Sequence, residues 1–338
     1  MKGRKKVCLS FILFIVMALL ISCVKNPVVI ENEIGFESPE QNQEFPSRAI
    51  QIVIPFAPGG GTDSVARALI VSANNYFDQP VVAVNKLGES GARGLREGLL
   101  AAPDGYTVTL ITTETNSLSV FGLLDFNYTD IEPLLLLNTE PGVMVVSKNF
   151  PFNSIEELVE SIYKENKEYT IGSAGKGSNW DLAAKGVERE ADIKFESKFY
   201  NGTSLAVLDV LGGSLDIVIA GTSEVVQHLE KGEMKLLTVL ADERLEAFPD
   251  VKTFKESGYD FSIYTWRGLA IPQGVDPEVK RILMEGFANA AKDKNFIDML
   301  SQLRLNYDFR EQDDFIEFLE QDLEFYNEMN NNLSDSLN

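Results

Sequence analysis

From Arg48 onward, short runs rich in β-branched residues alternate with amphipathic segments of helical spacing. This alternation is typical of α/β proteins with largely parallel strands, because each helix returns the chain across the sheet. A helix is predicted within residues 153–168, where Ser154 and Glu157 have the spacing of a capping box. Strands are predicted at residues 50–56, 80–86, 107–112, 143–147, 169–174, 215–221 and 235–241.

Two of these predicted strands lead through glycine-rich turns into predicted helices. The first turn lies in "IPFAPGGGTDSVARAL" at residues 54–69, and the second in "YTIGSAGKGSNWDLAA" at residues 169–184. In open α/β sheets, ligands bind beyond the carboxyl ends of the strands, where helices begin. A helix N-terminus offers unpaired N–H groups and a partial positive charge, so it attracts an anion without Lys or Arg. The two turns therefore predict a cleft with one anion-binding loop on each wall.

Neither turn has the spacing of a nucleotide-binding motif. A P-loop needs glycine at the position of Thr170 and Ser or Thr after Lys176, where Gly177 stands. A dinucleotide fingerprint that starts at Gly59 would need glycine at Ser64. The sequence thus predicts a small anionic ligand and no nucleotide cofactor.

The amino terminus has the layout of an export signal. Four basic residues at positions 2–6 precede the apolar stretch 7–21, which is short for a membrane span of about 20 residues. The stretch ends in "LISC", so Cys23 resembles the acylated cysteine of a bacterial lipoprotein signal. We expect a signal peptide at residues 1–22, a lipid on Cys23 and a flexible tether over 23–45. An ordinary secretory signal with an incidental cysteine is the alternative.

Composition excludes several functions. The 30 Lys and Arg face 51 Asp and Glu, a net charge of −21, which argues against binding to nucleic acid or an anionic membrane surface. The two cysteines, Cys8 and Cys23, leave no pair for a disulfide or zinc site once the signal is removed. The single histidine, His228, lies in a predicted amphipathic helix, and no G-x-S-x-G motif occurs. We therefore expect no catalysis, metal or cofactor.

Over residues 46–320, the chain resembles a known family of receptors. The segments "IVIPFAPGGGTDSVARAL", "NKLGESGARGLREGLLAAPDGYTVTLITT", "IGSAGKGSNWDLAA" and "FYNGTSLAVLDVLGGSLDIVIAG" follow in the order found in substrate-binding proteins of tripartite tricarboxylate transporters, the TctC or Bug family. The resemblance implies an α/β clamp of the periplasmic-binding-protein type (type II-like), with a mostly parallel sheet in each lobe. Domain 1 would comprise residues 46–140 and 266–338, and domain 2 residues 141–265.

The resemblance also implies a set of ligand contacts. Family members hold a carboxylate through N–H groups and hydroxyls of the two glycine-rich loops, with further contacts from the wall of the cleft. The matching positions are Phe56, Ala57, Gly59, Gly60, Gly61, Thr62, Asp63, Thr113, Ser173, Ala174, Gly175, Gly177, Ser178, Asn179, Asn201, Gly202, Thr203, Ala220 and Gly221. For Asp63, a role as a helix cap is favoured over a ligand contact.

Two departures from the family pattern bear on specificity. Asn179-Trp180-Asp181 stands where the family commonly has a histidine, and Asn201 stands where it has a lysine. A second ligand carboxylate would meet less positive charge, and a buried unpaired anion is costly. We therefore expect a ligand with one carboxylate and a neutral, aromatic or ammonium end that Asp181 or Trp180 contacts.

The expected function is that of a lipid-anchored receptor of the cell envelope, facing the periplasm or the cell surface. It would capture a small organic acid or amino-acid-like ligand and deliver it to membrane subunits of a transporter, acting as a monomer. The alternative is a sensing lipoprotein that signals to a membrane sensor kinase. A third possibility, an exported hydrolase, would have to use His228.

Overall fold

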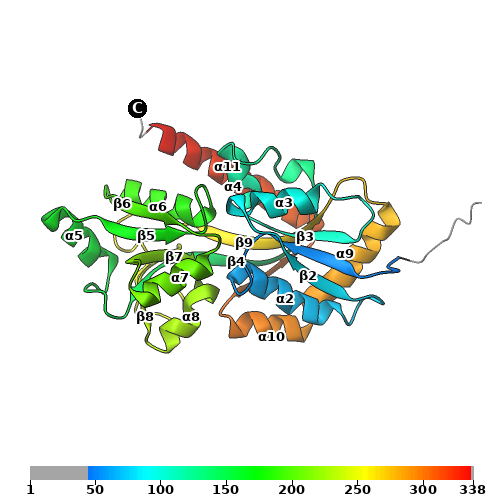
Figure 1. Cartoon of the computed structure of the whole chain (residues 1–338), viewed down its shortest axis with the longest axis horizontal. Coiled ribbons are helices and arrows are strands. Elements are labelled where there is room, and N and C mark those ends of the chain that lie inside the picture. The colour runs from blue at the N-terminus through cyan, green and yellow to red at the C-terminus, as the bar shows by residue number, and fades with distance from the viewer. Residues whose placement is uncertain (1–44, 336–338) are drawn as a thin grey trace, which may run out of the picture. The chain divides into compact units, whose positions relative to one another are not determined.

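The computed structural model of the protein describes residues 45–335, with side chains through residue 331 (Figure 1). The predicted signal peptide, Cys23 and all but the last residue of the predicted tether lie outside these residues. Within them, ten strands form one sheet, whose main path has the order β2-β1-β3-β9-β4-β7-β5-β6, while β8 and β10 both pair with β4. The strands are β1 (Ile50–Ile54), β2 (Val81–Asn85), β3 (Thr107–Thr112), β4 (Glu132–Ser147), β5 (Tyr169–Ser173), β6 (Phe195–Phe199), β7 (Ile217–Gly221), β8 (Met234–Leu240), β9 (Tyr264–Ile271) and β10 (Asn306–Arg310).

The sheet is mixed. Strand β1 is parallel to β2 and β3, and β5 is parallel to β6 and β7. Strands β9 and β4 run antiparallel to all of their partners, β4 also pairing with β8 and β10. The α/β class is confirmed, but the sheet is less parallel than expected because β9 and β4 lie between the parallel strands.

Strand β4 joins two groups of strands. Its residues 132–141 pair with β9, and its residues 142–147 pair with β7 and β8. We call β1, β2, β3, β9, β10 and residues 132–141 the first strand group. Strands β5 to β8 with residues 142–147 form the second strand group. The change of partners falls between Pro141 and Gly142, so one continuous strand connects the two groups.

Helices cover both faces of each strand group (Figure 1). Alternate strand residues point to opposite faces, so Leu110 packs in one apolar cluster and Ile111 in another. In the first group, the cluster of Leu110 includes α2 (Gly61–Ala73), α9 (Pro277–Lys292) and α10 (Lys294–Gln302), and that of Ile111 includes α3 (Ala92–Leu99), α4 (Glu114–Val120) and α11 (Gln312–Asp335). In the second group, α5 (Ile155–Glu165) and α6 (Asn179–Glu190) share one cluster, and α7 (Thr203–Gly212) and α8 (Thr222–Glu230) share the other.

Helix α11 contacts both strand groups. Phe315 and Leu319 near its start belong to a cluster of the first group, whereas Tyr326 and Met329 are buried in a cluster of the second. The Tyr326 hydroxyl donates a hydrogen bond of 2.5 Å to the Asn179 Oδ1 atom at the start of α6. The carboxyl-terminal helix therefore links the two groups independently of β4 and β9.

All seven predicted strands are confirmed, and β6, β9, β10 and the first part of β4 were missed. The missed strands lack a clean apolar pattern: β6 and β10 are short and polar, β9 carries Arg267, and β4 contains Pro133 and Pro141. The predicted helix is confirmed as α5, with Ser154 as its N-cap. Its capping box is incomplete, because the Glu157 carboxylate accepts from the Asn153 N–H instead.

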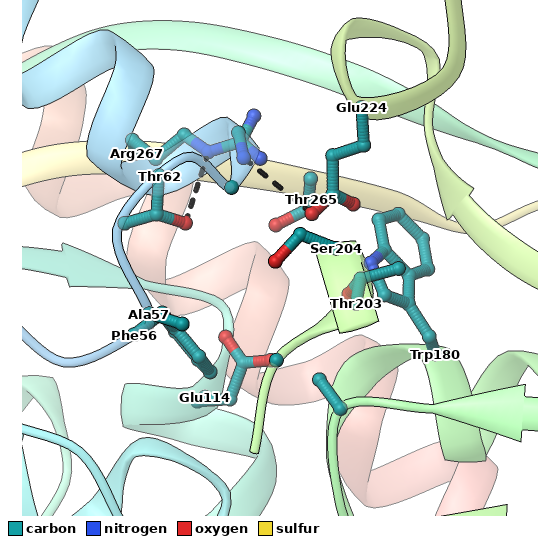
Figure 2. Close-up of a pocket in the computed structure, with 14 residues that line it drawn as sticks. Phe56, Ala57, Thr62, Glu114, Trp180, Thr203, Ser204, Glu224, Thr265 and Arg267 are labelled. Carbon is teal, nitrogen blue, oxygen red and sulfur yellow. Dashed lines mark hydrogen bonds between the residues drawn. The ribbon is translucent and has the colours of Figure 1, made fainter. Parts of the chain in front are cut away.

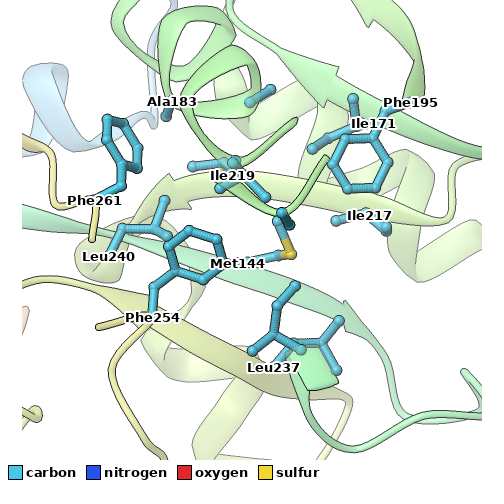
Figure 3. Close-up of a cluster of buried hydrophobic side chains, with 14 of the residues drawn as sticks. Met144, Ile171, Ala183, Phe195, Ile217, Ile219, Leu237, Leu240, Phe254 and Phe261 are labelled. Carbon is cyan, nitrogen blue, oxygen red and sulfur yellow. The ribbon is translucent and has the colours of Figure 1, made fainter. Parts of the chain in front are cut away.

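The main apolar cluster of the second strand group forms around its strands (Figure 3). Met144 of β4 and Ile219 of β7 pack there with Phe254 and Phe261 from the segment between β8 and β9. Phe254 is fully buried and stacks on Tyr259, with ring centroids 4.6 Å apart. This connecting segment is thus held in place by its own aromatic side chains.

Phe254→Ala tests this packing. Removing a fully buried aromatic ring leaves a cavity, so we expect the free energy of unfolding to fall by about 3–5 kcal/mol in urea denaturation followed by circular dichroism. Leu208→Ala is the control, because Leu208 is 59% exposed on α7 and its truncation leaves no cavity. Equal losses in the two variants would contradict the packing described.

Candidate functional site

A pocket lies where the carboxyl ends of the parallel strands of both groups meet (Figure 2). Five helix starts, those of α2, α4, α6, α7 and α8, and strand β9 supply its lining. Of the predicted site residues, eight line it: Phe56, Ala57, Gly60, Gly61, Thr62, Ala174, Gly202 and Thr203. The other lining residues are Glu114, Trp180, Ser204, Glu224, Thr265 and Arg267, of which only Trp180 was considered from the sequence.

The remaining predicted residues do not line this pocket. Several support the loops behind it: Ser178 is the N-cap of α6, and Gly175 approaches Ser90 of the first group so closely that a Cβ atom would lie 2.3 Å from its Oγ atom. The residues outside the lining are Gly59, Asp63, Thr113, Ser173, Gly175, Gly177, Ser178, Asn179, Asn201, Ala220 and Gly221.

The first glycine-rich loop leads directly into α2. Gly60 is the N-cap and has no side chain to cap the helix, and the Gly61 N–H donates to the Glu224 carboxylate at 3.4 Å. The Asp63 carboxylate accepts from the Gly59 N–H at 2.9 Å and from Arg67 at 2.7 Å, so the Asp63 side chain holds the loop. Burial alone would raise the pKa of Asp63, but these hydrogen bonds and that from Asn85 keep it below its usual value. The N–H groups at the start of α2 therefore face the pocket in a fixed position.

The second glycine-rich loop does not offer all the free N–H groups that the sequence predicts. Its N–H groups are used by the chain's own carboxylates: Gly177 donates to Asp181 at 2.7 Å, and Asn179 donates to Glu114 at 3.2 Å. Asp181 also pairs with Lys185 at 2.6 Å and does not line the pocket, so its carboxylate is already used within the chain. Carboxylates of the chain itself thus cap helix α6 and take the place that the sequence predicts for an anion.

In place of α6, helix α7 provides the second helix start with unused N–H groups at the pocket. Its N-cap is Gly202, no side chain caps it, and Gly202, Thr203 and Ser204 all line the pocket. Gly202 has φ +154°, and a Cβ atom there would lie 3.1 Å from the Ala57 Cβ atom, so glycine allows this close approach of the two loops. Thr203 is 5% exposed, and its hydroxyl has no hydrogen-bond partner among the described residues.

A buried ion pair lies beside the pocket, between Arg267 of β9 and Glu140 of β4. Both side chains are at most 3% exposed. Arg267 also donates weakly to the Thr62 hydroxyl at 3.5 Å, and Glu140 accepts from the Ser223 N–H at 2.6 Å. The pair therefore connects the start of α2 in the first strand group with the start of α8 in the second.

Glu224 is the most perturbed acid of the lining. Its carboxylate accepts from the N–H groups of Gly61 at 3.4 Å and Gly221 at 3.1 Å. Burial raises the pKa of Glu224 to about 7, the neighbouring Glu140 carboxylate adds to the increase, and Arg267 opposes it. The Glu224 carboxyl group thus titrates near neutral pH inside the pocket.

The walls of the pocket lie close together. The free space is about 30 Å³, which is room for only a few water molecules. The Ser90 hydroxyl, in the turn before α3, donates to the Lys176 carbonyl oxygen of the second glycine-rich loop at 2.9 Å. A ligand of several carbon atoms therefore requires the walls to separate before it binds.

Sequence reasoning missed the charged residues of the lining for identifiable reasons. Arg267 is a single charge within the apolar run of β9, a pattern that in retrospect signals a buried, paired cation. Glu114 and Glu224 stand at helix starts, where an acid is normally a cap. His228 of α8 forms a hydrogen bond of 2.7 Å with Glu233, which follows the helix, and His228 does not line the pocket.

Comparisons with known proteins agree with this architecture. A profile of the tripartite tricarboxylate transporter family receptors matches residues 65–332. The chain belongs to this receptor family. The receptor is 28% identical to protein BugT of Bordetella pertussis over 269 residues, which cover 78% of this chain and 82% of BugT. Within residues 45–335, no helix is both long and apolar enough to cross a membrane.

Solved structures share the fold of the receptor. The periplasmic binding protein BugD is 27% identical, with a TM-score of 0.82 over 86% of this chain and 99% of BugD. MatC from Rhodopseudomonas palustris, solved with bound malate, is 24% identical, with a TM-score of 0.79 over 84% of this chain and 99% of MatC. The expected periplasmic-binding-protein fold is therefore confirmed.

The raised pKa of Glu224 predicts a pH dependence of stability. Between pH about 4.5 and 7 the folded receptor holds a proton on Glu224 that the unfolded chain has released, so stability falls as the pH rises through this window. Glu224→Gln should flatten the decrease in melting temperature between pH 5 and 8. Burial also raises the pKa of Asp322 to about 7, so part of the decrease in melting temperature should remain in the Glu224→Gln variant.

Differential scanning fluorimetry across this pH range measures the effect. Glu196→Gln is the matched control, because Glu196 is exposed on β6. A slope that is the same in wild type and Glu224→Gln would show that Glu224 is ionised throughout this range.

Proposed function

We propose that this receptor is exported, is anchored by a lipid on Cys23, and captures a small carboxylate-bearing metabolite between two lobes for delivery to a tripartite tricarboxylate-type membrane transporter. The observation that carries the proposal is the pair of helix starts with unused N–H groups, those of α2 and α7, that line one pocket from the two strand groups. The malate bound to MatC, a protein of the same fold, supports a carboxylate as the ligand.

The carboxylate would lie between these two helix starts. The N–H groups of Thr62 and Asp63 on α2, and of Thr203 and Ser204 on α7, have no hydrogen-bond partner among the described residues. Two helix dipoles pointing at one anion add their favourable charge interactions. The unpaired Thr203 hydroxyl and the indole N–H of Trp180, which lines the pocket and is 5% exposed, supply further donors.

Binding would be coupled to movement of two lobes. We assign residues 46–140 and 266–338 to one lobe and 141–265 to the other, because β4 changes partners between Pro141 and Gly142 and β9 begins at Tyr264. The narrow pocket corresponds to the closed arrangement. A ligand that contacts both helix starts stabilises this arrangement by its differential affinity for it, and the transporter would recognise the closed form.

A Thr203→Val variant tests the carboxylate site. The ligand is first sought by measuring the melting temperature of the wild-type protein with malate, succinate, adipate, aspartate and leucine. Calorimetry then measures the affinity for the compound that raises the melting temperature most. A hydrogen bond to a charged group is worth about ten- to hundredfold in affinity, so Thr203→Val should weaken binding by about that factor. The isosteric control is Thr129→Val, on an exposed turn of the first strand group. Equal affinities in the two variants would show that the Thr203 hydroxyl does not bind the ligand.

The lipid anchor has its own test. In cells that express the full chain, we expect the wild-type protein to partition into the detergent phase of Triton X-114, because acyl chains bind strongly to micelles. Cys23→Ser removes the acylated sulfur, so the variant should appear in the aqueous phase or remain unprocessed. Wild-type protein in the aqueous phase with a free Cys23 would instead support the ordinary secretory signal.

A further inference from the structure

The charges that line the pocket are not balanced. Three ionisable side chains line it, Arg267, Glu114 and Glu224. The positive charge of Arg267 is already matched, because its guanidinium group pairs with the buried Glu140 carboxylate. Neither Glu114 nor Glu224 forms an ion pair with any described residue. Glu114 is buried and Glu224 is half-buried. Carboxylates with so little access to water are normally paired, so the lining carries negative charge that no described side chain compensates.

The two unpaired carboxylates, Glu114 and Glu224, differ in how many hydrogen bonds they accept. Glu114 accepts hydrogen bonds from the Thr112 hydroxyl at 2.5 Å and the Thr113 hydroxyl at 3.2 Å, as well as the bond from the Asn179 N–H. Glu224 accepts only two bonds, both from backbone N–H groups, and the bond from Gly61 is long. A carboxylate has about four acceptor positions, so Glu224 has unused capacity. A positive group that balances the lining would therefore bind beside the Glu224 carboxylate.

The surroundings of Glu224 explain why a cation would be favoured there. Glu140 of β4 faces it with a like charge, Arg267 of β9 lies nearby but is shared with Glu140, and α2 contributes the Gly61 N–H. Each Glu224 oxygen accepts one N–H group, which favours the ionised form of the carboxyl group. Figure 2 shows Glu224 at the same end of the pocket as Arg267 and Thr62, with Glu114 at the other end.

We propose that the ligand is a zwitterion, in which an ammonium or quaternary ammonium group pairs with Glu224 while the carboxylate binds at the starts of α2 and α7. This inference rests on the proposed carboxylate-binding function and names its substrate class as amino acids and related compounds. Dicarboxylates without a positive group would bring a second negative charge to a wall that already holds Glu114, Glu140 and Glu224.

Calorimetry with matched compounds tests the proposal. The pairs are leucine and 4-methylpentanoate, aspartate and succinate, and 4-aminobutyrate and butyrate, each of which differs by one ammonium group. We expect at least one ammonium compound to bind about tenfold or more tightly than its partner at pH 7.5. Glu224→Gln should remove that difference by weakening the ammonium compound, whereas the exposed-site control Glu196→Gln should leave both affinities within about twofold.

Three results would overturn the proposal. A deaminated acid that binds as tightly as its ammonium partner in every pair would show that no cation is recognised. Deaminated acids that bind more tightly at pH 5.5 than at pH 8, with the pH effect lost in Glu224→Gln, would show that protonated Glu224 donates to the ligand. In both cases the carboxylate-binding function would stand. If none of the six compounds bound, and none of the screened carboxylates either, the proposed function itself would fail.

Discussion

The buried ion pair between Arg267 and Glu140 is the interaction on which the arrangement of the site depends. It joins β9 to β4, the strand that connects the two groups, and Glu140 stands just before the point where β4 changes partners. Breaking a buried pair leaves an uncompensated charge, which is strongly unfavourable. Through Thr62 and Ser223, the pair fixes the starts of α2 and α8 against the strands. The geometry of the anion site thus follows from a charge pair that no ligand needs to touch.

The chain's own carboxylates decide which helix starts remain free. Asp181 and Glu114 use the N–H groups at the start of α6, and Glu224 uses those of Gly61 and Gly221. The N–H groups of Thr62 and Asp63 on α2, and those of Thr203 and Ser204 on α7, remain without an acceptor among the described residues. In the proposed site, an acidic protein with a net charge of −21 would attract an anion through backbone N–H groups, while Glu224 would favour a cation beside it.

Much of this arrangement was predictable from the sequence, and the rest depended on contacts between distant residues. The alternation of strands and helices gave the α/β class and seven strands, and the glycine-rich turn at Gly60 and Gly61 marked one wall of the pocket. Glycines mark where backbone comes close, but they do not show which N–H groups are already used. The hydrogen bond from the Asn179 N–H to Glu114, 65 positions away, uses a donor of the second glycine-rich loop that the sequence predicted to be available to a ligand. Arg267 lies in a strand that was missed because its own charge interrupts the apolar pattern.

The most direct test is a crystal structure of the receptor with a bound carboxylate, refined to a resolution at which its oxygen atoms are distinct. The account predicts that these oxygens accept hydrogen bonds from the N–H groups of Thr203 and Ser204 on α7 and from the start of α2. Asp181 and Glu114 should still accept from Gly177 and Asn179. A carboxylate bound instead to Gly177 and Asn179, with Asp181 and Glu114 displaced, would contradict it.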